Sequence, residues 1–119
     1  MNKFYTKDHE WISVVGNIAV VGITKHAAEA LGDIVFVQLP NVDDEYKEES
    51  SVSVIESVKA ASDVYSPVNC KVLDVNFELN DSPEKVSSDP EGEGWLFKCS
   101  FDGDTSKLLS HDEYQKLIS

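Results

Sequence analysis

The chain has 119 residues, of which 41% are hydrophobic and 27% charged, and this size and composition are typical of a single globular domain, here residues 1–119. Ten Lys and Arg against 22 Asp and Glu give a net charge of −12, which argues against nucleic-acid and anionic-membrane partners. The charge suits docking onto basic patches of partner proteins, and solubility alone is the default alternative. No targeting segment or membrane-spanning run is evident, so we expect a cytoplasmic protein.

The N-terminal part predicts a β-hairpin followed by a short helix. Two β-rich runs, Trp11 to Val15 and Ile18 to Ile23, are separated by a Gly-Asn dipeptide, which is a typical two-residue hairpin turn. Thr24 is a suitable N-cap for a helix over Lys25 to Leu31, and Gly32 would end that helix.

The central part predicts further strands. Ile34 to Leu39 is a strongly apolar strand that precedes a proline, and residues 41 to 50 form an acidic connecting loop. Ser51 to Ile55 alternates in polarity as a half-buried strand does, and Cys70 to Phe77 is the next apolar strand after a turn-like Ser-Pro-Val-Asn segment.

The C-terminal part predicts one more strand between two helices. Ser82 and Pro83 are the N-cap and first residue of a short helix, and Trp95 to Phe101 is the last strand. Ser110 and Glu113 have the spacing of a capping box. The apolar face of the helix that follows is predicted to contain Tyr114, Leu117 and Ile118. Many short strands with a few short helices indicate a mainly β sandwich or flattened barrel.

Motifs of enzyme active sites are absent: there is no nucleophile elbow, phosphate-binding loop, dinucleotide fingerprint or zinc-protease motif. His9, His26 and His111 lack metal-ligand spacing, so we expect no catalytic residue and no metal site. Cys70 and Cys99 lie in predicted strands and are interpreted as buried free thiols. The alternative is an enzyme in which these two thiols form a redox pair.

Lys59 is the candidate functional residue. It lies between two predicted strands, with small side chains beside it, and this arrangement presents an amine at the tip of a hairpin. A Schiff-base lysine needs an apolar pocket, which the flanking sequence does not provide. An exposed lysine on a tight turn suits covalent attachment of a cofactor on a flexible tether, and an ordinary surface charge is the alternative.

The segment Val54 to Pro67, Val-Ile-Glu-Ser-Val-Lys-Ala-Ala-Ser-Asp-Val-Tyr-Ser-Pro, resembles the lipoylation motif of the glycine cleavage system H protein family. Within it Lys59 is flanked by Glu56, Ser57, Val58 and Ala60. The similarity extends over nearly the whole chain. Further matching blocks include His9-Glu10-Trp11, Val21-Gly22-Ile23-Thr24, Ala30 to Val37, Leu39-Pro40, Gly92 to Leu96, and Glu113-Tyr114.

This resemblance implies a lipoyl/biotinyl-type β sandwich with short helices and a C-terminal helix, and a carrier rather than an enzyme. Lys59 would bear lipoate in amide linkage, added by a lipoate-attaching enzyme. The arm would receive the aminomethyl group of glycine from the pyridoxal-phosphate P protein, pass it to the aminomethyltransferase T protein, and be reoxidised by the dihydrolipoyl dehydrogenase L protein. Such carriers lie in the bacterial cytoplasm, or in the mitochondrial matrix once a presequence has been removed.

The resemblance also implies a cleft for the loaded arm. Glu10 is the expected partner of the aminomethyl amine, with Ile23, Leu31 and Asp63 as its neighbours, and a plain surface carboxylate is the alternative for Glu10. A related lipoyl relay protein that donates lipoyl groups to other acceptors is the alternative function. A biotinyl carrier is disfavoured because Val58 and Ala60, rather than methionines, flank the lysine.

Two departures from the family pattern concern backbone geometry. Glu49 replaces a usual glycine, and a left-handed backbone there would cost roughly 1 kcal/mol. Asn69-Cys70 replaces a usual Ser-Gly turn, and Asn69 is expected to tolerate the left-handed conformation.

Overall fold

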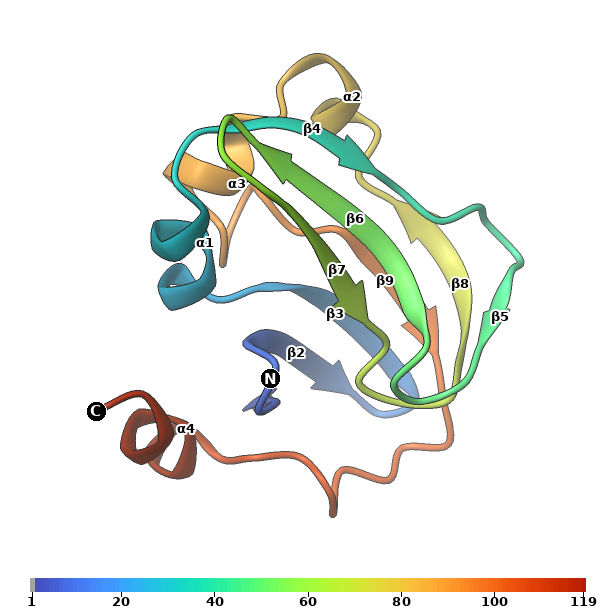
Figure 1. The fold of residues 1–119 in the computed structure, drawn as a ribbon. Coiled ribbons are helices and arrows are strands. Elements are labelled where there is room, and N and C mark those ends of the chain that lie inside the picture. The colour runs from blue at the N-terminus through green and yellow to red at the C-terminus, as the bar shows by residue number, and fades with distance from the viewer. Residues whose placement is uncertain (1) are drawn as a thin grey trace.

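The computed structural model describes residues 2–119, which form two antiparallel sheets stacked face to face (Figure 1). The larger sheet has the order β1 (Asn2–Tyr5), β2 (Glu10–Val15), β3 (Ile18–Ile23), β9 (Phe97–Ser100), β8 (Cys70–Val75) and β5 (Glu45–Tyr46). The smaller has the order β4 (Ile34–Gln38), β6 (Ser51–Ser57) and β7 (Ala61–Tyr65). The helices of this described part are α1 (Lys25–Leu31), α2 (Glu78–Asp81), α3 (Lys85–Ser88) and α4 (His111–Ile118).

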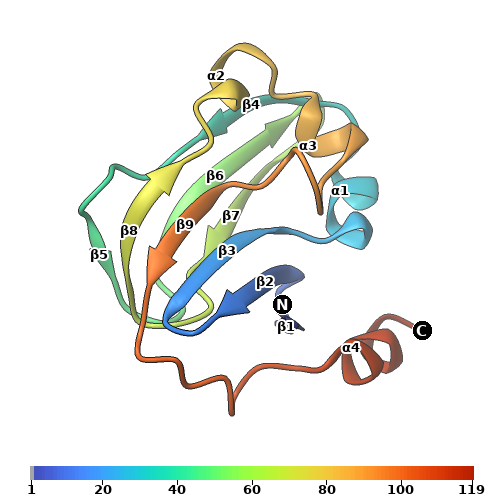
Figure 2. The same cartoon turned by 180° about the vertical axis from the view of Figure 1, so that it is seen from behind.

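The main core lies between the two sheets, whose stacking both views of the ribbon show (Figures 1 and 2). Alternate residues of each strand point inward because side chains on a strand alternate between its two faces. The fully buried members include Ile12, Val21, Val37, Ile55, Val72 and Phe97. This architecture confirms the predicted mainly β sandwich with short helices and a C-terminal helix.

A second, aromatic cluster attaches α4 to the sandwich. The ring of Tyr5 stacks on that of Tyr114 with centroids 4.8 Å apart, and Trp11 completes the cluster. The predicted capping box is confirmed, since the Ser110 hydroxyl accepts from the Glu113 N–H and the Glu113 carboxylate accepts from the Ser110 N–H. Tyr114 is buried at 2% exposure.

The predicted apolar face of α4 is wrong in one residue. Leu117 is 50% exposed, whereas Ile118 packs against the aromatic cluster. The helix is short and packs on β1, and the stripe from Tyr114 to Ile118 is the part that reaches the aromatic cluster.

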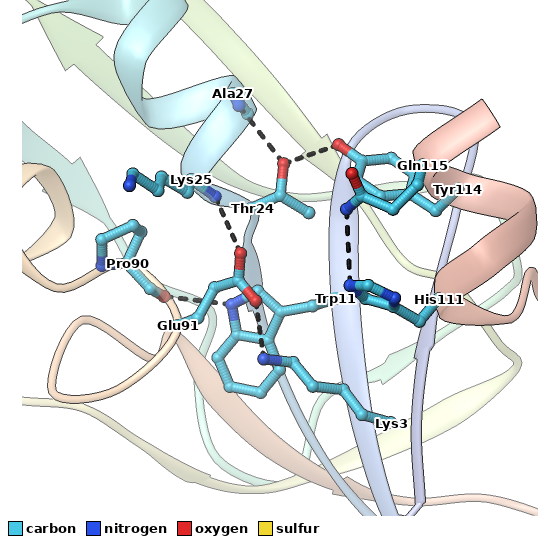
Figure 3. A network of polar contacts seen from close by, with 10 residues as sticks. All are labelled: Lys3, Trp11, Thr24, Lys25, Ala27, Pro90, Glu91, His111, Tyr114 and Gln115. Atoms are coloured by element: carbon cyan, nitrogen blue, oxygen red, sulfur yellow. Dashed lines mark hydrogen bonds and ion pairs between the residues drawn. The ribbon is translucent and has the colours of Figure 1, made fainter. Parts of the chain in front are cut away.

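The loop before β9 is fixed to the N-terminal strands by Glu91 (Figure 3). Its carboxylate accepts from the Lys3 Nζ at 2.6 Å and from the backbone N–H of Lys25 at 3.0 Å. The Trp11 Nε1–H donates to the carbonyl of Pro90 at 3.0 Å, and the Lys3 ammonium lies 5.0 Å above the indole ring. These contacts bring β1, the start of α1 and the loop into one polar network.

Replacing Gly22 with alanine should destabilise the fold by about 1–3 kcal/mol, because the new methyl overlaps the Trp11 ring. Gly22 is the β-partner of Trp11, and a Cβ there would lie 2.7 Å from the indole Nε1. Urea unfolding measures the loss. In the background of Trp11→Leu, which removes the ring, the same substitution should cost less, and an equal cost in both backgrounds would contradict this explanation.

Two elements differ from the sequence prediction in the segment after β8. The predicted strand to Phe77 ends at Val75, because the buried Asn76 amide turns to donate to the carbonyls of Glu93 and Trp95. The chain then forms α2, which was not predicted. Ser82 ends α2 instead of capping a helix, and its N–H donates to the Glu78 carbonyl.

Smaller differences concern strand ends and turns. The last strand runs over 97–100 and is shorter than predicted, and the acidic loop contains the two-residue β5. Asn69 does not use the left-handed region; its side-chain oxygen accepts the Glu48 N–H at 2.7 Å instead. Glu49 does use that region, with φ at +69°. Cys70 and Cys99 are buried free thiols, as predicted.

Candidate functional site

Lys59 lies in the tight turn that joins β6 to β7, at the end of the sandwich where α1 and α3 also lie (Figure 1). Ser57 organises this turn. Its backbone N–H donates to the Ala60 carbonyl at 2.7 Å, and its hydroxyl accepts from the N–H groups of Lys59 and Ala60 at 3.3 and 3.1 Å. The turn is therefore fixed by one buried serine while the lysine side chain is exposed.

The surroundings leave room for the lysine amine. Val58 is 72% exposed, and its N–H donates to the Asp33 carbonyl at 3.1 Å, which joins the turn to the segment after α1. Gly32 ends α1 with φ at +81°, and a Cβ placed there would lie 3.9 Å from the Lys59 Cε. A non-glycine residue at position 32 would thus have a strained backbone, and its Cβ would be in ordinary van der Waals contact with the lysine stem. Glu56 and Ala60 are exposed beside the turn.

Glu10 is the first residue of β2 and is buried at 3% exposure. Its Oε1 accepts from the Thr6 hydroxyl at 2.6 Å, and its Oε2 accepts from the Tyr65 N–H at 3.3 Å. Burial raises the pKa of Glu10 from its ordinary value of 4.5 to about 7, although both hydrogen bonds act in the opposite direction. A buried carboxyl with such a pKa is a functional-site candidate, and a plain surface carboxylate is excluded by its burial.

The Glu10 carboxyl lines a pocket of about 230 Å³, called here the Glu10 pocket. Tyr65, Ser66 and Pro67 form one wall and Leu108 and Leu109 another. The charged residues around the pocket are Lys7, Asp8, Glu48, Glu49 and Lys107. Since Tyr65 ends β7 and Lys59 precedes its start, the pocket and the lysine turn lie at opposite ends of this strand, about 13 Å of extended chain apart from Ala61 to Tyr65.

The other three predicted cleft residues lie at different places between the Lys59 turn and the Glu10 pocket. Ile23 is the direct β-partner of Glu10 and is buried. Leu31 is the last residue of α1, partly buried against the core and next to Gly32 at the lysine end. Asp63 is exposed on β7 between the two ends, and its carboxylate accepts from the Ser51 hydroxyl at 3.0 Å. The smaller sheet ends at β7, and no strand within residues 2–119 pairs with its outer edge.

Comparison with known proteins decides the family. The family model described as "Glycine cleavage H-protein" matches residues 3–119. The chain belongs to the glycine cleavage H-protein family. This confirms the resemblance inferred from the lysine motif, and with it the role of a lipoyl carrier in glycine cleavage.

Individual family members agree along almost their full length. The glycine cleavage system H protein of Thermotoga maritima is 52% identical over 119 residues, covering 98% of this chain and 96% of the relative. That of Carboxydothermus hydrogenoformans is 50% identical over 116 residues, covering 96% and 89%. The crystal structure of a glycine cleavage system H protein from Mycobacterium marinum superposes with a TM-score of 0.91 at 36% identity, covering 98% of this chain and 96% of that one.

Sequence reasoning missed the partners of Glu10 and an imidazole cluster. Nothing in the sequence distinguishes Thr6, or the backbone of Tyr65, as a hydrogen-bond donor to Glu10. The fold also brings His9 and His26 together with ring centroids 4.8 Å apart, and His9 Nδ1 lies 2.8 Å from the Tyr114 hydroxyl. Burial lowers the pKa of His9. Across residues 2–119 no group of three or more potential ligands is arranged to hold a metal.

The helices of the described chain are short. Among residues 2–119 none combines the length and the apolar character that crossing a bilayer requires.

Replacing Glu49 with glycine should stabilise the fold and lower the pKa of Glu10. The left-handed backbone of Glu49 costs about 1–2 kcal/mol in a non-glycine residue, and the greater freedom of unfolded glycine offsets about half of that gain. The negative charge of Glu49 also contributes to the raised pKa of Glu10. Urea unfolding and carboxyl NMR titration measure the two effects.

The matched variant Glu49→Gln removes the charge but keeps the backbone conformation. It should lower the Glu10 pKa without the gain in stability. A Glu10 pKa that stays the same in both variants would show that Glu49 does not act on Glu10.

Proposed function

We propose that the Lys59 Nζ carries lipoate in amide linkage and that the chain delivers the aminomethyl group of glycine from the P protein to the T protein. The observation that carries this proposal is the Lys59 turn, in which a rigid hairpin presents an exposed amine. The lipoyl group, when attached, supplies a disulfide that accepts the aminomethyl carbon on one sulfur while the other sulfur is reduced.

The residues around Lys59 fit this attachment. An acylating enzyme needs an accessible amine on a backbone that does not move, and Ser57 provides that backbone. Glycine at position 32 keeps the stem of the lysine free of a neighbouring side chain. Acylation removes the charge of Lys59, and the turn accommodates this because it contains no ion pair to Lys59 within residues 2–119.

We assign Glu10 as the residue that receives the cargo. The exposed side of β7, with Ala61 and Asp63, leads from Lys59 to the Glu10 pocket, and its length is comparable with an extended lysyl-lipoyl chain. A primary ammonium in the pocket would neutralise a carboxylate that has no cationic partner among residues 2–119, and removal from bulk water would slow hydrolysis of the cargo. Ile23 supports Glu10 from the neighbouring strand, and Leu31 covers the start of the path.

The surface charge indicates how the carrier approaches its partner enzymes. A net charge of −12 steers the carrier toward basic surfaces, and such steering weakens as ionic strength rises. We propose that the P protein, the T protein, the L protein and the lipoate-attaching enzyme each contact the lysine end of the sandwich in turn. Since the relatives named above come from bacteria, we place this cycle in the bacterial cytoplasm.

Glycine-dependent loading tests the proposal and separates it from a lipoyl relay. The lipoylated chain, incubated with glycine and the P protein, should release carbon dioxide and gain one aminomethyl group by intact mass. Addition of the T protein and tetrahydrofolate should remove that group. A chain that is lipoylated yet fails to load, but passes its lipoyl group to another acceptor domain, would establish the relay function instead.

A further inference from the structure

The hydrogen bonds of the Thr6 side chain determine where its hydroxyl proton points. The hydroxyl oxygen accepts from the N–H of Glu10 at 3.2 Å and from the N–H of Asp8 at 3.3 Å. A hydroxyl has one proton and two acceptor lone pairs, so both lone pairs are occupied. The proton must therefore point to the remaining partner, the Glu10 Oε1 at 2.6 Å.

The turn around Thr6 prevents the hydroxyl from reversing this direction. The backbone of Thr6 donates to the Glu10 carbonyl at 3.0 Å and accepts the His9 N–H at 3.1 Å, and His9 has a left-handed backbone with φ at +69°. Rotating the hydroxyl would leave backbone N–H groups inside the turn without a partner. Thr6 is thus a fixed donor to Glu10.

Both oxygens of Glu10 consequently face donors. Oε1 accepts from the Thr6 hydroxyl and Oε2 accepts from the Tyr65 N–H, and each of these donors stabilises the ionised carboxylate relative to the protonated acid. We propose that Thr6 is a positioning residue which favours the ionised form of Glu10 and orients its carboxylate, so that the pocket selects a primary ammonium over a neutral group. This inference rests on the proposed function only for the identity of the ammonium as the cargo on the arm.

The other charges near Glu10 do not account for this selectivity. Asp8 and Glu49 are the negative groups that act on it, and both oppose its ionisation. Glu48 also lines the pocket, and its nearest cation is Lys107 at 3.9 Å. Lys7 and Lys107 line the same pocket, yet neither forms an ion pair with Glu10 among the described residues. The two neutral donors are thus the groups that favour the anion, and its remaining lone pairs are available to an incoming ammonium.

Titration of the unlipoylated chain, with glutamate carboxyl carbons labelled with ¹³C, tests the positioning role directly. In Thr6→Val, which keeps the shape but lacks the hydroxyl, the Glu10 midpoint should rise by about one pH unit, since the lost bond goes to a charged group. Thr6→Ser keeps the hydroxyl and should restore the wild-type midpoint. An unchanged midpoint in Thr6→Val, or an equal rise in Thr6→Ser, would overturn the proposal.

A measurement on the wild-type chain covers the case in which Thr6→Val disturbs the turn. The amide protons of Asp8 and Tyr65 should shift with the same midpoint as the Glu10 carboxyl, because both belong to the same hydrogen-bond chain. Independent midpoints would contradict the arrangement.

Release of the cargo links the positioning role to function. Loaded Thr6→Val should lose its aminomethyl group several-fold faster than the wild type. In a Glu10→Gln background the same substitution should not increase the rate of loss any further. Additive effects of the two substitutions would overturn the assignment of Thr6 to Glu10. If the wild-type chain cannot be loaded at all, the proposed function is wrong. The titration uses the unlipoylated chain, so it tests the role of Thr6 independently of loading.

Discussion

Replacing Lys59 with arginine should abolish lipoylation and leave the fold unchanged. Arginine keeps a positive charge at the turn, but its guanidinium stays protonated and does not offer the amine nucleophile that acylation requires. The Lys59 side chain forms no hydrogen bond or ion pair within the described chain that this substitution would break. Intact mass after incubation with lipoate, ATP and the attaching enzyme should show one added lipoyl group in the wild type and none in the variant.

The matched control for this experiment is Lys71→Arg, in the exposed part of β8. It should be lipoylated as well as the wild type and should support glycine-dependent release of carbon dioxide. A lipoyl group on the Lys59→Arg variant, or its absence from Lys71→Arg, would show that the exposed turn is not the determinant of modification.

Replacing Glu10 with glutamine should make stability less dependent on pH. The pKa of Glu10 is raised to about 7 in the folded chain from an ordinary 4.5. Between these values the folded chain retains a proton that the unfolded chain has lost, so the free energy of unfolding falls as pH rises through this window. From pH 5 to pH 8 the wild type should therefore lose on the order of 2 kcal/mol more stability than the glutamine variant.

The same substitution should also accelerate loss of the aminomethyl cargo. Glutamine cannot form an ion pair with an ammonium, whereas lipoylation at Lys59 is unaffected because the two sites lie at opposite ends of β7. Urea unfolding at the two pH values and the rate of ammonia release from the loaded carrier measure the effects. Glu48→Gln, which alters an exposed carboxylate of the same pocket, should change neither. Identical pH profiles for wild type and Glu10→Gln would refute the role of burial.

The parts of the site that depend on local sequence could be predicted. A two-residue Gly-Asn turn fixes the register of β2 and β3, so Val15 faces Ile18 and Glu10 must face Ile23. The Lys59 turn likewise follows from two adjacent strand patterns. Both features are contained within fewer than twenty residues of chain.

The Glu10 pocket could not be predicted from residue patterns because its parts are distant in sequence. Tyr65 reaches Glu10 only when the smaller sheet packs on the larger one. Its donor is a backbone N–H, which almost every residue type has, so the sequence does not indicate which residue donates. The hydroxyl of Thr6 acts through a turn in which His9 has a left-handed backbone, and histidine does not signal such a turn as glycine would. Resemblance to the family identified Glu10, whereas its partners came from the fold.

The position of Thr24 has a practical consequence for attaching this protein to other molecules. Its hydroxyl accepts from the Ala27 N–H at the start of α1, and it also bonds the Tyr114 hydroxyl of α4 at 2.8 Å (Figure 3). The helix that ends beside Lys59 is therefore tied to the last helix of the chain. A fusion partner or affinity tag that pulls α4 away would uncover Tyr5 and Trp11 and weaken the cap of α1, so a flexible spacer after Ser119 is advisable when the carrier is tethered to an enzyme.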